Sequence, residues 1–136
     1  MPTWVNAIGA SVVVLLGIGC TADDEFCNPD ATGLNCVCAG GDSCDIHCGE
    51  VGECDTQCSG GSRCSVDCEG TRGDCDVECA SAASCEVDCR SSSSCQVTCP
   101  ARCTVRNCTL GSGCNVTCGL SGVARQQGPD AVCGAT

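Results

Sequence analysis

Apolar and polar residues alternate in short runs that recur about every ten residues along the middle of the chain. Each run begins and ends with cysteine, and its middle residue, usually β-branched, stands among polar residues. The runs are residues 44–48, 54–58, 64–68, 75–79, 85–89, 95–99, 103–108 and 114–118. Strand side chains point alternately to two faces, so in each five-residue run the cysteines and the middle residue face one side. The pattern therefore predicts one half-buried strand per run.

The segments between the runs are rich in glycine and serine, which predicts turns. A strand and a turn that recur at a short fixed period are typical of a solenoid, whose coils stack about 4.8 Å apart. We therefore expect an all-β fold, a small disulfide-stapled β-solenoid of about ten-residue coils. Its regularly spaced inward cysteines resemble those of the disulfide-stapled β-solenoids of insect antifreeze proteins, in architecture only. The alternative is an irregular cystine-rich repeat array.

Composition shows what would fill such a core. The 136 residues include 21 cysteines, one tryptophan, one phenylalanine and no tyrosine. A domain this poor in large apolar side chains does not offset the entropy of folding by burial alone, so covalent cross-links must contribute. Cysteine at this density is typical of a disulfide scaffold in an exported protein.

Strand geometry limits how the cysteines pair. Cysteines at i and i+4 of one strand lie roughly 13 Å apart, which is too far for a disulfide. Pairing across the following turn is more natural, although the spacing leaves bonds between adjacent coils open as an alternative. The expected pairs are Cys27 with Cys36, Cys38 with Cys44, Cys48 with Cys54, Cys58 with Cys64, Cys68 with Cys75, Cys79 with Cys85, Cys89 with Cys95, Cys99 with Cys103, Cys108 with Cys114, and Cys118 with Cys133.

The N-terminal residues carry an export pattern. Residues 1–19 are typical of a signal peptide, and their apolar run at 7–18 is too short for a comfortable membrane span. Residues 16–20, LGIGC, resemble the lipobox of bacterial lipoproteins, with glycine at position 17 where leucine is usual. The resemblance implies that Cys20 is diacylated and becomes the new N-terminus. The alternative is cleavage after Ala22 by an ordinary signal peptidase, and both routes leave an even twenty cysteines to pair.

These patterns divide the chain into four parts. Residues 1–19 are the signal peptide, and residues 20–40 hold the lipidated N-terminus, a tether and an N-terminal cap. The Cys-rich decapeptide repeat domain spans residues 41–119. Residues 120–136, where the repeat loosens, are expected to form a C-terminal cap, because terminal units of solenoids are often atypical.

Charge and residue types restrict the function. The formal net charge is −11, with no lysine, which argues against nucleic-acid binding. His47 is the only histidine, and the chain has no nucleophile elbow or phosphate loop, so we expect no enzyme and no catalytic residue. Soft-metal binding by thiolates is a weaker alternative, because C-x-C occurs once and C-x2-C never.

Carboxylates occupy many of the outward positions and are expected to stack in columns at strand spacing. The set consists of Asp67, Asp76, Glu78, Glu86 and Asp88, joined at one end by Asp45 and Asp55. A hard divalent ion with oxygen ligands relieves the repulsion of stacked carboxylates, so Ca²⁺ is the candidate ligand, and no other cofactor is expected. The competing interpretation is a solvated acidic face that keeps an exported protein soluble.

Together these features predict an exported cell-envelope lipoprotein, at the outer membrane or cell surface, with a rigid acidic repeat domain in a structural or adhesion role. Secretion without an anchor is the alternative location, and metal binding through carboxylates or thiolates is the alternative function. One expected partner is the membrane, reached through the lipid anchor. The other is an envelope or extracellular protein or polysaccharide whose identity the sequence does not indicate.

Overall fold

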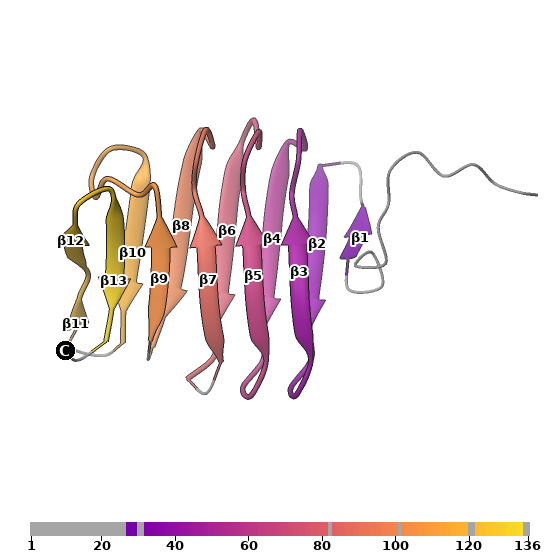
Figure 1. Cartoon of the computed structure of the whole chain (residues 1–136). Helices are drawn as coiled ribbons and strands as arrows, with labels where there is room; N and C mark the ends of the chain where they lie inside the picture. Colours follow the sequence, from indigo (N-terminus) through magenta and orange to yellow (C-terminus); the bar gives the residue numbers. More distant parts are fainter. Residues whose placement is uncertain (1–26, 30–31, 82, 101, 120–121, 135–136) are drawn as a thin grey trace, which may run out of the picture.

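The computed structural model describes residues 27–29, 32–81, 83–100, 102–119 and 122–134. The regular structure of these residues is entirely β-strand, arranged in two facing layers (Figure 1). The predicted signal peptide and the predicted lipidation site Cys20 lie outside the described residues. No helix within the described ranges is long and apolar enough to cross a membrane.

The chain alternates between two sheets as it advances along the stack. Sheet A contains, in spatial order, β1 (Cys27–Pro29), β2 (Gly33–Cys38), β4 (Glu53–Cys58), β6 (Asp74–Cys79), β8 (Ser94–Cys99), β10 (Cys114–Cys118) and β11 (Gly122–Val123). Sheet B contains, in spatial order, β12 (Arg125–Gln127), β13 (Asp130–Cys133), β9 (Cys103–Arg106), β7 (Ser84–Asp88), β5 (Arg63–Asp67) and β3 (Ser43–His47). Strands β2 to β10 pair in parallel within their sheets, as expected for coils that all advance in one direction.

The predicted β-solenoid is confirmed, but its coils are twice as long as expected. Ser43 lies opposite Arg63 in the pair β3–β5, and Cys64 lies opposite Cys85 in the pair β5–β7. One coil therefore takes two repeats, about twenty residues, and the expectation of ten was wrong. The physical reason is that a five-residue run is already a whole strand, and a closed coil needs one strand in each layer to cover the core.

Cystine and small β-branched side chains fill the space between the sheets. The inward row of sheet B consists of Ile46, Val66, Val87 and Val105, and that of sheet A includes Thr56, Val77 and Val97. These side chains are at most 2% exposed. The residues on either side of each one point to solvent, so the alternation predicted for the strands is the one observed.

In the described part of the chain, ten disulfides tie the coils together, in the pairing expected across the turns. Eight of them close a corner between consecutive strands of different sheets, with Cα–Cα distances from 5.5 to 6.5 Å. The other two, Cys27 with Cys36 and Cys118 with Cys133, secure the ends of the stack. Corner pairing is favoured because two cysteines that flank a short turn fall within the Cα range of a disulfide.

Antiparallel strands close both ends of the stack. β1 pairs with β2, β11 pairs with β10, and β13 pairs with β9. At the C-terminal end, the side-chain amide of Gln126 donates to the carbonyl oxygens of Cys108, Gly128 and Asp130. Its side-chain oxygen accepts a hydrogen bond from the N–H of Leu110. This one side chain thereby satisfies several backbone groups at the C-terminal end of the stack.

The observed elements shift one predicted boundary. The segment 120–136, expected to be a cap, contains the short strands β11, β12 and β13. The segment 20–40, expected to hold only a tether and a cap, also contains β2. Because β2 pairs in parallel with β4, it is the first strand of the regular stack, and the repeat begins earlier than residue 41.

Candidate functional site

The two outward faces of the solenoid carry different charges. The described strands of sheet A contain no arginine, lysine or histidine. Five carboxylates stand together on β4 and β6, and we call them the sheet A carboxylates: Glu53, Asp55, Asp74, Asp76 and Glu78. Parallel pairing places Asp55 directly opposite Asp76, so like charges lie one strand spacing apart.

Crowding changes the ionisation of one member of this group. Burial raises the pKa of Asp76 above its ordinary value, and the negative charges of Asp55 and Asp74 raise it further. A shallow hollow of about 420 Å³ lies over these strands. Its lining includes Asn35, Asp55, Gln57, Asp76, Glu78, Gln96 and Thr98. Carboxylate, amide and hydroxyl groups in this combination favour cationic partners and hydrogen-bond donors over anions.

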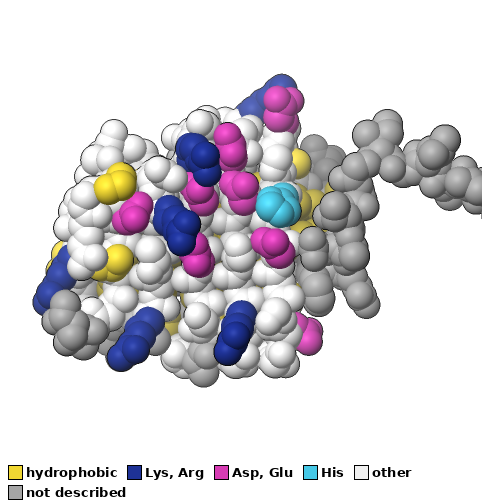
Figure 2. All heavy atoms as spheres, in the orientation of Figure 1, with side chains coloured by type: hydrophobic (Ala, Val, Ile, Leu, Met, Phe, Trp, Pro, Cys, Tyr) yellow, Lys and Arg dark blue, Asp and Glu magenta, His cyan; other side chains and the backbone are white. Residues whose placement is uncertain are grey.

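Sheet B presents charges of both signs on its outward face, which Figure 2 shows. Arg106 forms an ion pair with Glu86, and Arg90 forms one with Asp88 at 2.8 Å. Burial alone would raise the pKa of Asp88, but hydrogen bonds from Arg90 and Asn107, together with the Arg90 charge, lower it below its ordinary value. Part of the negative charge on the sheet B face is therefore neutralised by its own arginines. The described strands of sheet A have no basic residue that could do the same.

His47, the one histidine, lies on the open surface of sheet B. Its ring nitrogens are 3.8 Å from a carboxylate oxygen of Asp45 and 3.6 Å from one of Asp67. The His47 side chain is 59% exposed. The three side chains form a polar cluster that is open to solvent and not enclosed in a pocket.

The predicted Ca²⁺ ligands do not share one face. Asp76, Glu78 and Asp55 belong to sheet A, whereas Asp67, Glu86, Asp88 and Asp45 belong to sheet B. The expectation that carboxylates of neighbouring runs stack was wrong, because successive strands alternate between sheets and only every second run is a neighbour. Within the described ranges, no three carboxylates bring oxygen atoms within 4.8 Å of one another.

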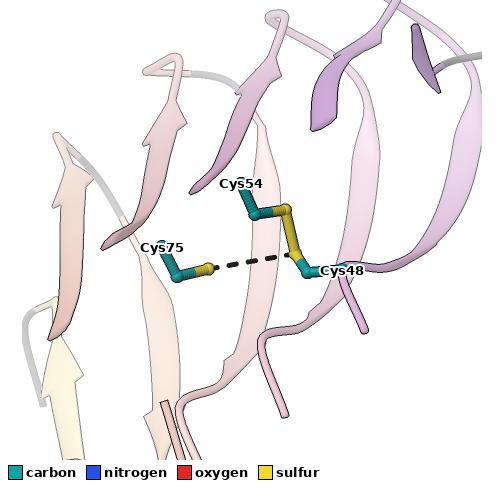
Figure 3. Close-up of side chains that lie close together, drawn as sticks. All are labelled: Cys48, Cys54 and Cys75. Atoms are coloured by element: carbon teal, nitrogen blue, oxygen red, sulfur yellow. Dashed lines mark hydrogen bonds between the residues drawn. A yellow bond between two sulfur atoms is a disulfide. The ribbon is translucent and has the colours of Figure 1, made fainter. Parts of the chain in front are cut away.

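Cysteine sulfurs do gather, but as disulfides. Among the described residues, four groups of three sulfurs lie within 4.8 Å of one another, including that of Cys48, Cys54 and Cys75 (Figure 3). Cys48 is bonded to Cys54 and Cys75 to Cys68, so none of the three is a thiolate ligand. The two disulfides nevertheless approach closely, with 4.0 Å between the Sγ atoms of Cys48 and Cys75.

Strand register also reveals a feature that sequence reasoning missed. Two hollows on sheet B meet over β7, because Ser84 and Glu86 line both of them. Arg63 of β5 lies opposite Ser84 of β7, and Arg102, the residue just before β9, stands on the other side of Ser84 when the register of β7 and β9 is continued by one residue. Arg63, Ser84 and Arg102 are far apart in sequence. They can be placed together only when the length of the coil, about twenty residues, is known.

Fold and surface together define the class of protein: a rigid, cystine-rich β-solenoid with charged outer faces. Solenoids of this kind offer extended surfaces, and the fold fits a structural or interaction role. Comparison with protein-family models, with curated proteins and with solved structures gives no match to this chain.

Proposed function

We propose that this chain is an exported cell-envelope lipoprotein whose cystine-stapled rod has a structural or adhesive, non-catalytic role. The observation that carries the proposal is that all twenty described cysteines are paired, in ten disulfides. Disulfides form and persist in oxidising compartments, which favours a location outside the cytoplasm. The disulfides also constrain every coil, which suits a structural protein that must stay folded outside the cytoplasm.

A lipid anchor at Cys20 completes the proposal. Of the 21 cysteines, Cys20 is the one that has no place in the ten pairs. It follows an apolar run and a small residue, as in a lipobox. In sequence, residues 21–26 separate it from β1, so the rod would begin a short tether away from the membrane. Two acyl chains are enough for stable membrane attachment.

The sheet A carboxylates are the contact face we assign to the adhesive role. Their charge is not neutralised by any basic residue in the described strands of the same sheet. A partner that carries amino or guanidinium groups matches this face. Because the described chain presents no aromatic side chain as an anchor, we expect each contact to be weak and overall binding to depend on several contacts at once.

The anchor is tested by expressing the full precursor in an exporting bacterial host beside the variant Cys20→Ala. We expect the unsubstituted protein in the membrane fraction, with an intact mass that includes a diacylglyceryl group, and the variant in the soluble fraction. The neighbouring substitution Thr21→Ala keeps the cysteine and serves as control. A variant that stays in the membrane fraction after its signal peptide has been cleaved, or a native protein with many free thiols, would contradict the proposal.

The contact face is tested with two variants of equal net charge. One neutralises sheet A through Asp55→Asn, Asp76→Asn and Glu78→Gln, and the other neutralises sheet B through Asp45→Asn, Asp67→Asn and Glu86→Gln. Against an oligolysine peptide, we expect the sheet A variant to lose about fivefold in affinity, since exposed charge pairs contribute up to about 1 kcal/mol each. Equal losses in the two variants would show that only net charge matters.

Metal binding is the alternative function that the sequence predicts. A rise in Tm with millimolar Ca²⁺, absent in Na⁺ of equal ionic strength, would favour it over adhesion. For soft metals, the corresponding result is zinc or copper in the native mass spectrum together with free thiols after denaturation.

A further inference from the structure

The two hollows on sheet B form one continuous trough that crosses the strands. One hollow, of about 350 Å³, runs from β3 to β7, and the other, of about 430 Å³, runs from β7 to β13. We call the joint feature the sheet B trough. Its outward side chains are Ser43, Asp45, Arg63, Ser65, Ser84, Glu86, Arg102, Thr104, Gln127 and Val132. Hydroxyl, guanidinium and carboxylate groups therefore line the trough.

Two arginines of the trough have no anionic partner. Three other arginines of the described chain, Arg72, Arg90 and Arg106, each form an ion pair with a carboxylate. Arg63 and Arg102 form none within the described ranges, although this is a strongly acidic protein. Figure 2 shows dark blue side chains along the lower margin of this face, where these strands begin.

The carboxylates of the trough are engaged elsewhere. Glu86 forms its ion pair with Arg106, and Asp45 lies 3.8 Å from His47. Both of these partners stand in the next row along the strands, away from the row of Arg63 and Arg102. Arg63 and Arg102 are both exposed. No carboxylate in the described part of the trough forms an ion pair with either guanidinium group.

The spacing of the two arginines restricts the shape of the ligand. Arg63 lies opposite Ser84. Cys103 lies opposite Cys85, so Arg102, the residue before Cys103, stands beside Ser84. The backbones at Arg63 and Arg102 are therefore two strand spacings, about 9.6 Å, apart. An extended peptide repeats side chains on one face at about 7 Å or about 14 Å, which fits poorly. In a polysaccharide with one acidic group in every disaccharide, the distance between acidic groups is longer than the repeat of about 7 Å in a peptide. Its hydroxyl groups can also bond the serines and the threonine of the trough.

We infer that the sheet B trough binds a strand of an acidic polysaccharide, with Arg63 and Arg102 each holding a carboxylate or sulfate group. A planar guanidinium pairs with such oxyanions through two parallel hydrogen bonds. The sheet A carboxylates do not prevent this, because they lie on the opposite face and charges are screened within about 8 Å at physiological salt. This inference goes beyond the proposed function and does not depend on lipidation.

The test uses the full, oxidised chain and a hyaluronan oligosaccharide of defined length, which carries one carboxylate per disaccharide. A neutral chitin oligosaccharide of equal length and an oligoaspartate peptide are the comparison probes. We expect hyaluronan to bind more tightly than either, and the affinity to fall with added salt. The double variant Arg63→Gln and Arg102→Gln should lose about tenfold or more, because hydrogen bonds between charged groups are the strong ones.

Two further variants keep the result interpretable. Arg72→Gln with Arg90→Gln makes the same change in net charge outside the trough, and we expect less than about a twofold loss. Ser84→Asp places a carboxylate between the two trough arginines at an exposed position and should abolish binding while the disulfides stay intact. Equal binding of the chitin oligosaccharide or of oligoaspartate, equal losses in the two arginine pairs, or no hyaluronan binding at millimolar concentration would overturn the inference.

Discussion

At the scale of the residue, one buried hydroxyl stands out. Thr56 occupies a core position that is 1% exposed. The equivalent residues of sheet A are valine in β6, β8 and β10 and cysteine in β2. Its Oγ1 has no hydrogen-bond partner among the described residues. A buried hydroxyl without a partner costs about 1–3 kcal/mol, and valine has nearly the same shape.

We therefore expect Thr56→Val to raise the free energy of unfolding by about 1 kcal/mol or more. Guanidinium denaturation of the oxidised protein, followed by circular dichroism, measures the change. Thr117→Val, at an exposed position of the same sheet, is the matched control and should change stability little. A less stable Thr56→Val would show that the hydroxyl has a partner, such as a buried water.

Two aspartates should respond to pH in opposite directions. The pKa of Asp88 is lowered in the folded protein, so its contribution to stability is present at neutral pH and is lost as pH falls from its ordinary value of 3.8 through the lowered pKa. The pKa of Asp76 is raised, so its charge destabilises the fold at neutral pH, and this effect fades as pH falls through the raised pKa.

We expect Asp88→Asn to lower stability at pH 7 and Asp76→Asn to raise it, with both differences shrinking at the acid end. Unfolding titrations at a series of pH values measure both variants under the same conditions. The two substitutions make the same change in net charge, so each controls for the other. A shift of equal sign in both would mean that net charge, rather than local environment, governs the response.

At the scale of the element, glycine sets how closely two turns stack. A Cβ built at Gly73, just before β6, would lie 2.1 Å from the carbonyl oxygen of Gly52, just before β4. No side chain fits such an approach without moving the backbone. Gly73→Ala should therefore cost about 1–3 kcal/mol, in the range of overpacked cores, and disturb the pairing of β4 with β6.

Hydrogen exchange of the β6 amides in Gly73→Ala is the direct measurement, because loosened pairing lowers their protection. Ser65→Ala, at an exposed position of sheet B, is the control and should leave protection unchanged. Unchanged protection in Gly73→Ala would show that the turn adapts to the added methyl group.

Sequence reasoning reached the strands and the disulfides but not the neighbours of each strand. Alternation in runs such as 64–68 determines which side chains face inward, whatever lies next to the strand. The corner pairs followed from the reach of a disulfide, as Cys58 with Cys64 illustrates. Whether the next strand along the chain lies in the same sheet or in the opposite sheet depends on how the turns bend. The residue composition of the turns does not indicate this. This is why Asp76 and Glu86, ten residues apart, were expected on one face and lie on two.

At the scale of the whole molecule, stability is distributed along two columns of disulfides. Each inner bond closes a short loop, worth about 2 kcal/mol on the loop-entropy estimate, so removal of one pair should weaken the rod without unfolding it. Neighbouring bonds in a column lie close together, as the 4.0 Å between the Sγ atoms of Cys48 and Cys75 shows. The columns therefore allow exchange between adjacent disulfides if one sulfur is left unpaired.

The single variant Cys54→Ser and the double variant Cys48→Ser with Cys54→Ser separate these two effects. In the single variant, the Cys48 thiolate lies beside the Cys68–Cys75 bond. Its attack on Sγ of Cys75 forms a Cys48–Cys75 bond, breaks the Cys68–Cys75 bond and releases Cys68 as the thiolate. Peptide mapping after alkylation should find the label shared between Cys48 and Cys68.

The double variant leaves no unpaired cysteine among the described residues, so it should keep the other nine disulfides in their native pairing and lose about 2 kcal/mol in unfolding free energy. If the single variant instead carries its label on Cys48 alone, the column is static, and the close approach of its sulfurs has only a packing role. Exchange in the single variant with native pairing in the double would mean that a rod damaged at one bond can redistribute the loss along its column.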